Sequence, residues 1–148
     1  MNKKGFTLVE LLGVIVILSI IMLIAIPNVV STLERSKKDT YIADAKKMVS
    51  LIQYEIRKDK ISKPGNTAVD IKLSQLATDE INKDPDGYEY DKNKSFVRMQ
   101  IVNGYVVYQV QLVTSPKNDG KYRGIKLTDY ENLDGDKRYE TYVSNVSL

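Results

Sequence analysis

The fold is decided near the N-terminus, by the stretch Lys3-Lys4-Gly5-Phe6-Thr7-Leu8-Val9-Glu10. Behind it the chain runs for 22 residues, Leu11 to Thr32, without a charged side chain. A helix of about 20 apolar residues crosses the roughly 30 Å hydrocarbon core of a bilayer. The segment is therefore predicted to span a membrane. An ordinary signal peptide explains it less well, because the apolar run is too long and no small-x-small cleavage site follows it.

Glu10 is the residue that a plain membrane anchor does not explain. It lies at the head of the apolar run, where an anchor needs no acid. An ionised carboxylate in or near hydrocarbon is costly and usually has a partner. The position of Glu10 therefore indicates a function beyond anchoring.

The basic leader, the glycine and the acid together resemble the processing site of type IV prepilins. That family carries a basic leader ending in Gly, then Phe, then Thr-Leu-(Val/Ile)-Glu and an apolar helix, and every one of these positions matches here. The resemblance covers roughly residues 3–56. It implies that a membrane aspartyl peptidase cuts after Gly5 on the cytoplasmic side and N-methylates Phe6. It also implies that Glu10 pairs with the N-terminal amine of Phe6 in a neighbouring subunit during assembly.

Pro27 lies where the family places a helix-loosening proline. Proline lacks the backbone N–H and clashes with the preceding turn, so it kinks or unwinds a helix interior. A second interpretation stays open, in which Pro27 marks the end of the membrane helix.

Three parts of the chain are predicted: a leader at 1–5, a transmembrane or filament-core helix at 6–32, and an extracytoplasmic head at 33–148. Counting charges does not choose the orientation, because the flank after the apolar run holds more cations than the flank before it. We place the N-terminus in the cytoplasm, because the peptidase site requires it and long folded domains translocate largely regardless of charge.

Within the head, an amphipathic helix is predicted over 33–60, with Pro64-Gly65 ending it. Its apolar residues recur with a period of 3.6 and should pack against a sheet. They are Tyr41, Ala45, Met48, Val49, Ile52 and Ile56.

A loop is predicted over 61–94, in which Ile71, Leu73 and Leu76 could hold a short helix. An antiparallel sheet is predicted over 95–148, and its clearest element is a hairpin. Asn103-Gly104 suits a two-residue type I′ turn. This turn sets the register of four pairs: Val102–Tyr105, Ile101–Val106, Met99–Tyr108 and Val97–Val110.

The last three pairs should face the helix, and the polar residues between them should face away. A further strand is expected near Tyr122–Thr128, with Ile125 and Leu127 on one face. Tyr139–Leu148 either adds another strand or is a tail. The predicted fold class is therefore α+β, with a long N-terminal helix packed on a small antiparallel sheet, as the resemblance to type IV pilins also implies.

The composition argues against catalysis. The sequence has no Cys and no His, which removes thiol chemistry, the commonest general base and the commonest transition-metal ligand. No catalytic residue and no cofactor are predicted, and the net charge of +3 is too small to indicate nucleic acid. Two acidic turns leave a calcium alternative: Asp84 with Asp86, and Asp134 with Asp136.

Two functions remain open at this point. The first is a structural pilin that polymerises through its apolar helix into an extracellular type IV pilus. The second is a pseudopilin of a type II secretion or competence DNA-uptake system. Either way, the resemblance implies as partners further copies of the chain, other pilins, a prepilin peptidase, an assembly platform and the membrane.

Overall fold

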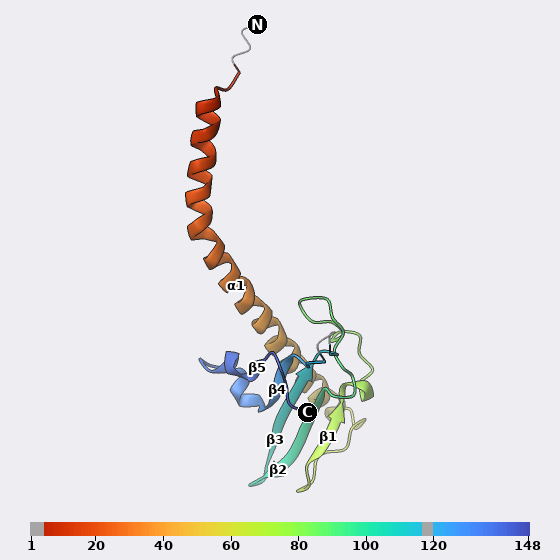
Figure 1. The fold of residues 1–148 in the computed structure, drawn as a ribbon. Helices are drawn as coiled ribbons and strands as arrows, with labels where there is room; N and C mark the ends of the chain where they lie inside the picture. The colour runs from red at the N-terminus through yellow and green to blue at the C-terminus, as the bar shows by residue number, and fades with distance from the viewer. Residues whose placement is uncertain (1–4, 117–119) are drawn as a thin grey trace. The chain divides into compact units, whose positions relative to one another are not determined.

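The computed structural model describes residues 5–116 and 120–148. The chain forms two compact units, Met1–Ser36 and Lys37–Leu148, and each is described by itself. One helix, α1 (Leu8–Arg57), contributes residues to both units (Figure 1).

The first unit consists mainly of α1, and every residue from 5 to 36 is exposed. Its hydroxyl side chains bond to the helix itself. Ser19 Oγ donates to the carbonyl of Ile15 over 2.7 Å, and Thr32 Oγ1 donates to the carbonyl of Asn28 over 2.9 Å. Hydroxyls that are satisfied within the helix can enter apolar surroundings at little cost.

Pro27 lies inside α1, and the helix continues past it. Because proline has no N–H, the carbonyl of Leu23 loses its helical donor at this point. Next to it, Asn28 Nδ2 donates to the carbonyl of Ile24 over 3.2 Å. Pro27 therefore interrupts the hydrogen-bond ladder without ending α1, and a kink at this residue stays a prediction.

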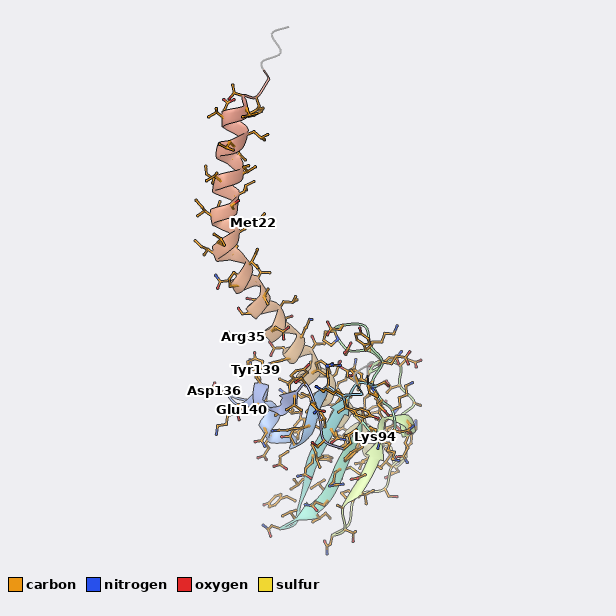
Figure 2. The ribbon with its side chains drawn as sticks, viewed as in Figure 1. Met22, Arg35, Lys94, Asp136, Tyr139 and Glu140 are labelled. Carbon is orange, nitrogen blue, oxygen red and sulfur yellow. The ribbon has the colours of Figure 1, made fainter. Side chains whose placement is uncertain are left out.

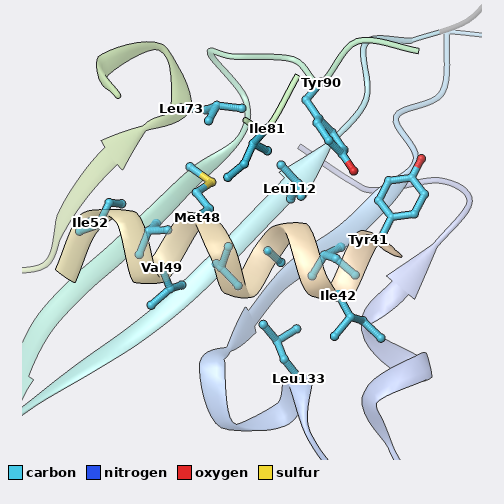
Figure 3. Packing of buried hydrophobic residues seen from close by; sticks show 14 of the residues in the cluster. Tyr41, Ile42, Met48, Val49, Ile52, Leu73, Ile81, Tyr90, Leu112 and Leu133 are labelled. Atoms are coloured by element: carbon cyan, nitrogen blue, oxygen red, sulfur yellow. The ribbon is translucent and has the colours of Figure 1, made fainter. Parts of the chain in front are cut away.

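The second unit buries one face of α1 against a sheet (Figure 3). The predicted apolar stripe is confirmed, with two differences: Ile42 is also buried, and Ile56 is only partly buried. The buried residues of α1 are Tyr41, Ile42, Ala45, Met48, Val49 and Ile52.

α1 ends at Arg57, before the predicted Lys60 and before Pro64-Gly65. Asp59 takes a positive φ of 56°, and its N–H donates to the carbonyl of Ile56 over 3.1 Å. The N–H of Lys60 donates to the carbonyl of Glu55 over 3.0 Å. These two bonds form a Schellman motif with aspartate in the left-handed position, which satisfies the last helical carbonyls.

The sheet has five antiparallel strands in the order β1-β2-β3-β4-β5. β2 and β3 are joined by a tight turn, and longer segments join the other strands; the described part of these segments includes three 3₁₀ helices (Figure 1). The strands are β1 (Val69–Lys72), β2 (Phe96–Val102), β3 (Tyr105–Val113), β4 (Gly124–Asp129) and β5 (Tyr142–Val143). The 3₁₀ helices are η1 (Leu73–Gln75), η2 (Tyr130–Leu133) and η3 (Arg138–Thr141). The predicted α+β layout is confirmed.

The predicted hairpin is confirmed in every pair of its register. Asn103 and Gly104 both have positive φ, 52° and 83°, as a type I′ turn requires. Val97, Met99 and Val110 are fully buried against the helix, whereas Val106, which was also expected to face it, is 40% exposed. Gln111, predicted to face away, is nevertheless buried, because its amide nitrogen donates to the carbonyl of Lys94 over 2.9 Å.

Two sequence-based predictions in the sheet are wrong. The segment 61–94 is not only a loop, because β1 lies in it and pairs with β2, Ile71 opposite Val97. Leu127 does not share a face with the buried Ile125, and it is 37% exposed. The cause is a β-bulge: two steps along β3, from Val110 to Leu112, correspond to three steps along β4, which reverses the alternation.

Candidate functional site: the start of α1

Thr7 and Glu10 form a reciprocal cap at the start of α1. The backbone N–H of Glu10 donates to Thr7 Oγ1 over 3.2 Å. In return, the backbone N–H of Thr7 donates to Glu10 Oε2 over 2.8 Å. Thr7 Oγ1 donates to the same carboxylate oxygen over 2.9 Å. This is a capping box, which satisfies two amides that the first helical turn leaves without partners.

The cap fixes how the carboxylate of Glu10 is presented. All three bonds involve Thr7, and both bonds to the carboxylate end on Oε2. The second oxygen, Oε1, is directed to no partner in the described residues. Glu10 therefore has a defined orientation and an oxygen that can accept a further donor.

The predicted processing site, Gly5–Phe6, lies just before this cap. Phe6 is 87% exposed, and a side chain added at Gly5 would meet nothing within 4 Å. Cleavage of this peptide bond would leave the cap intact, because every capping atom belongs to Thr7 or Glu10. The new N-terminal amine would then belong to the residue next to the N-cap.

The helix surface behind the cap is apolar on all sides. Nineteen large hydrophobic side chains between Phe6 and Leu33 are exposed. By length and composition, α1 is the one helix in the described chain that could cross a membrane. A helix that is apolar all round is stable only in lipid or inside a protein assembly.

The two acidic turns of the calcium alternative are far apart in the sequence and differ in what they contact. Asp84 is 7% exposed, and its carboxylate is occupied by protein donors. Tyr41 OH donates to Asp84 Oδ2 over 2.7 Å, and the amides of Asp86 and Tyr88 donate to Oδ1 over 2.9 and 2.7 Å. Asp84 thus joins its turn to α1.

The second acidic turn contacts α1 through Asp134, which forms an ion pair with Lys46. In the described residues, no three or more Asp and Glu side chains are grouped to hold a metal ion. Calcium binding at Asp84, Asp86, Asp134 and Asp136 therefore has no geometric support here and stays an untested prediction.

Sequence reasoning did not assign roles to Thr7 or to the Tyr41–Asp84 bond. The signal for Thr7 was present, since Thr-x-x-Glu before an apolar run is the pattern of a capping box. The Tyr41–Asp84 bond joins residues 43 positions apart, and no local pattern shows such a contact.

The comparisons with known proteins agree with this geometry. The family model for the prokaryotic N-terminal methylation motif matches residues 1–26. The ComG operon protein 3 homolog of Bacillus licheniformis is 34% identical over 67 residues, which cover 45% of this chain and 65% of that protein. Competence protein ComGC of Bacillus subtilis is 69% identical over 29 residues, 20% of this chain and 30% of that protein.

The chain thus spans less than two thirds of the length of these relatives. No solved structure matches it. The matches point to structural proteins rather than to enzymes, and the apolar helix with its prepilin motif fits a membrane anchor. The chain therefore carries the prokaryotic N-terminal methylation motif, and its resemblance to the type IV pilin family is confirmed in this N-terminal region.

Proposed function

We propose that this protein is a structural subunit of a type IV pilus, and that it polymerises through the apolar part of α1 after its leader is removed. The observation that carries the proposal is the exposed apolar helix whose start presents an oriented carboxylate. In this proposal the precursor crosses the cytoplasmic membrane once, with its N-terminus in the cytoplasm. The processed subunit then leaves the membrane and enters an extracellular filament.

The apolar surface supplies the driving force to remain in lipid or in a helix-packed core. Burying a large aliphatic side chain is worth about 1.5–3 kcal/mol. Nineteen such side chains therefore represent tens of kcal/mol that are not gained in water. Lipid and a filament core both provide this burial. Smaller electrostatic contributions to the free energy can therefore decide the transfer between them.

The carboxylate of Glu10 supplies such an electrostatic contribution. A carboxylate enclosed by packed apolar helices costs several kcal/mol when it has no partner. The amine of Phe6 in an adjacent subunit carries a positive charge at a helix N-terminus, where it gains from an anionic partner. The free oxygen Oε1 of Glu10 is the acceptor we assign to it. Correct axial register is then the arrangement in which both charges are satisfied.

Mass spectrometry of the mature N-terminus tests the processing step. We expect a chain that begins with N-methylated Phe6, released by a prepilin peptidase. A mature protein that retains Met1, or a cut near Ala25, would refute the proposal. The assembly platform and other pilins are further partners expected for this step.

A second candidate is a pseudopilin of a competence DNA-uptake system or a type II secretion system. The observation that favours it is the pair of relatives, one named for the ComG operon and the other a competence protein. It shares the cleaved leader and the helix-based polymer with the first candidate. It differs in that a short filament serves transport of other molecules.

Deletion of the gene in the organism that makes the protein separates the two candidates. Loss of long surface filaments with normal DNA uptake supports the pilus, and loss of DNA uptake without loss of surface filaments supports the competence pseudopilin. The gene neighbourhood gives an independent indication. A retraction ATPase nearby favours the pilus, whereas a secretin or a DNA-uptake channel favours the pseudopilin.

A further inference from the structure

The second unit carries a groove of about 580 Å³ between β3 and the segment that follows β4. One wall is β3 from Tyr105 to Tyr108, and the other runs from Asp129 to Asn132. Tyr105 is 78% exposed, the highest value among the large apolar and aromatic side chains of this unit. Exposed tyrosines beside acidic residues are suited to a protein contact that includes cations.

The groove also contains an open strand edge. β3 pairs with β4 only from Gln109 onward, although it pairs with β2 from Tyr105 to Gln111. Ile101 donates its N–H to the carbonyl of Gly65, so the Ile101–Val106 pair is of the non-hydrogen-bonded kind. The amide and carbonyl of Val106 therefore point away from β2 into the groove. Such an edge invites a contact from another chain.

Two carboxylates line the groove, and only one of them is bonded to another side chain of the described residues. Asp129 accepts a bond from Gln109 over 2.9 Å, while Glu131 makes no ion pair in the part of the chain that the structure describes. The lining of the groove holds these two acids and neither lysine nor arginine. A partner for this groove should therefore present cations.

The same unit presents three such cations at another corner of the sheet. Lys72 pairs with Phe96 at the start of β2, and the N–H of Ser74 donates to the carbonyl of Lys92 over 2.9 Å. Lys94 lies two residues further along. All three lysines are exposed, and none forms an ion pair within the described residues. In Figure 2, Lys94 lies apart from Asp136 and Glu140, which lie together.

The groove and the lysine corner are different surfaces of one unit. A contact between different surfaces of identical copies is heterologous, and it produces open filaments rather than closed dimers. We propose that the groove beside Glu131 in one copy receives the Lys72–Lys92–Lys94 corner of a second copy. This contact between the second units of two copies, the head contact, depends on the proposed filament in one respect: polymerisation brings parallel copies close together.

Disulfide cross-linking tests the contact directly, because the natural chain has no Cys. The full-length chain with Glu131→Cys and Lys94→Cys should form disulfide-linked dimers and longer ladders in membranes and in filaments. The matched control is Glu131→Cys with Lys63→Cys, since Lys63 is also exposed and makes no ion pair in the described chain. Equal cross-linking in both proteins, or adducts of a mass other than a multiple of this chain, would overturn the proposal.

Charge exchange tests the electrostatic part. Glu131→Lys alone, and Lys92→Glu with Lys94→Glu, should each lower the filament yield several-fold, because like charges would then face each other. Combining all three changes should restore the yield, whereas Lys63→Glu should leave it unchanged. Single changes without effect, or a combined variant no better than the single ones, would contradict the contact.

The two experiments also separate this contact from the filament itself. Cross-linking of membrane-bound subunits that never form filaments would retain the head contact and reject the proposed polymer. Filaments without specific cross-links would retain the polymer and reject the head contact.

Discussion

The two units differ in where their apolar side chains lie: they are exposed in the first unit and buried in the second. Residues 5–36 bury nothing, although they form the most apolar part of the chain. Residues 37–148 enclose a cluster in which Met48, Ile52, Met99, Leu112 and Ile125 are fully buried. The second unit is complete with its own residues, whereas the first needs lipid or further copies of the chain. Substitutions should therefore act on assembly in the first unit and on folding in the second.

The largest effect is expected from Glu10→Ala. It removes the carboxylate that we propose to pair with Phe6 of a neighbouring subunit, while it leaves the apolar surface unchanged. Expression, cleavage and membrane insertion should persist, and filaments should be lost or strongly reduced. Glu34→Ala is the control, because Glu34 is an exposed acid of the same unit beyond the apolar run. Normal filament yield from the processed Glu10→Ala protein would contradict the pairing.

Met99→Asp should unfold or strongly destabilise the second unit. Met99 is fully buried against α1, and an unpaired buried charge costs about 3–5 kcal/mol. The matched change Ile17→Asp lies on an exposed residue of the first unit and should leave the melting temperature of the second unit unchanged. All ten tyrosines lie between residues 41 and 142, so the tyrosine band in the near-UV circular dichroism of the full chain in detergent reports on this unit. Equal melting curves for both variants would contradict the burial of Met99 against α1.

Gly124→Ala should cost about 2–4 kcal/mol of folding stability. Gly124 has φ of 143°, and a Cβ at this position would lie 2.1 Å from the carbonyl oxygen of Leu112. Gly120→Ala is the control, since Gly120 also has a positive φ but has open space around it. It should cost only about 1 kcal/mol. Thermal unfolding of the two variants should therefore differ clearly, and similar losses would indicate that φ rather than the close approach controls the cost.

Gly124 also shows what the sequence could not reveal. The stripe of α1 and the hairpin at Asn103-Gly104 were predictable, because their signals are local periodicities and turn residues. The bulge in β4 and the approach of Gly124 to Leu112 depend on the register between β3 and β4, which no local pattern shows. At the start of α1, the acid and the cleavage motif were visible in the sequence. The orientation of the carboxylate required the bonds to Thr7.

Tyr41→Phe should destabilise the second unit by about 1–3 kcal/mol, because it removes a donor from the buried Asp84 carboxylate. Tyr105→Phe is the control, since Tyr105 is mostly exposed and its hydroxyl makes no bond in the described chain. The free energy of unfolding of each variant gives the comparison. A Tyr41→Phe protein as stable as the control would show that the Asp84 turn is held by its own backbone amides.

The smallest effect is expected from Asp44→Asn, and it depends on pH. Asp44 is half-buried and accepts a bond from Tyr90 OH over 2.8 Å. Burial raises the pKa of Asp44 above its ordinary value of 3.8, although the bond from Tyr90 and the charge of Lys47 act in the other direction. The folded protein therefore keeps this proton to a higher pH than the unfolded chain does.

The sign of the effect follows from this difference in proton binding. As the pH rises through 3.8, the unfolded chain ionises first, so the contribution of Asp44 to stability falls until the pH passes the raised pKa of the folded state. Asparagine keeps an acceptor for Tyr90 but does not ionise. Asp44→Asn should therefore match the natural protein at about pH 3 and be slightly more stable at about pH 7. Melting curves at both values measure it. A variant that is less stable at pH 7 would mean that the bond between Tyr90 and the ionised carboxylate outweighs the cost of burial.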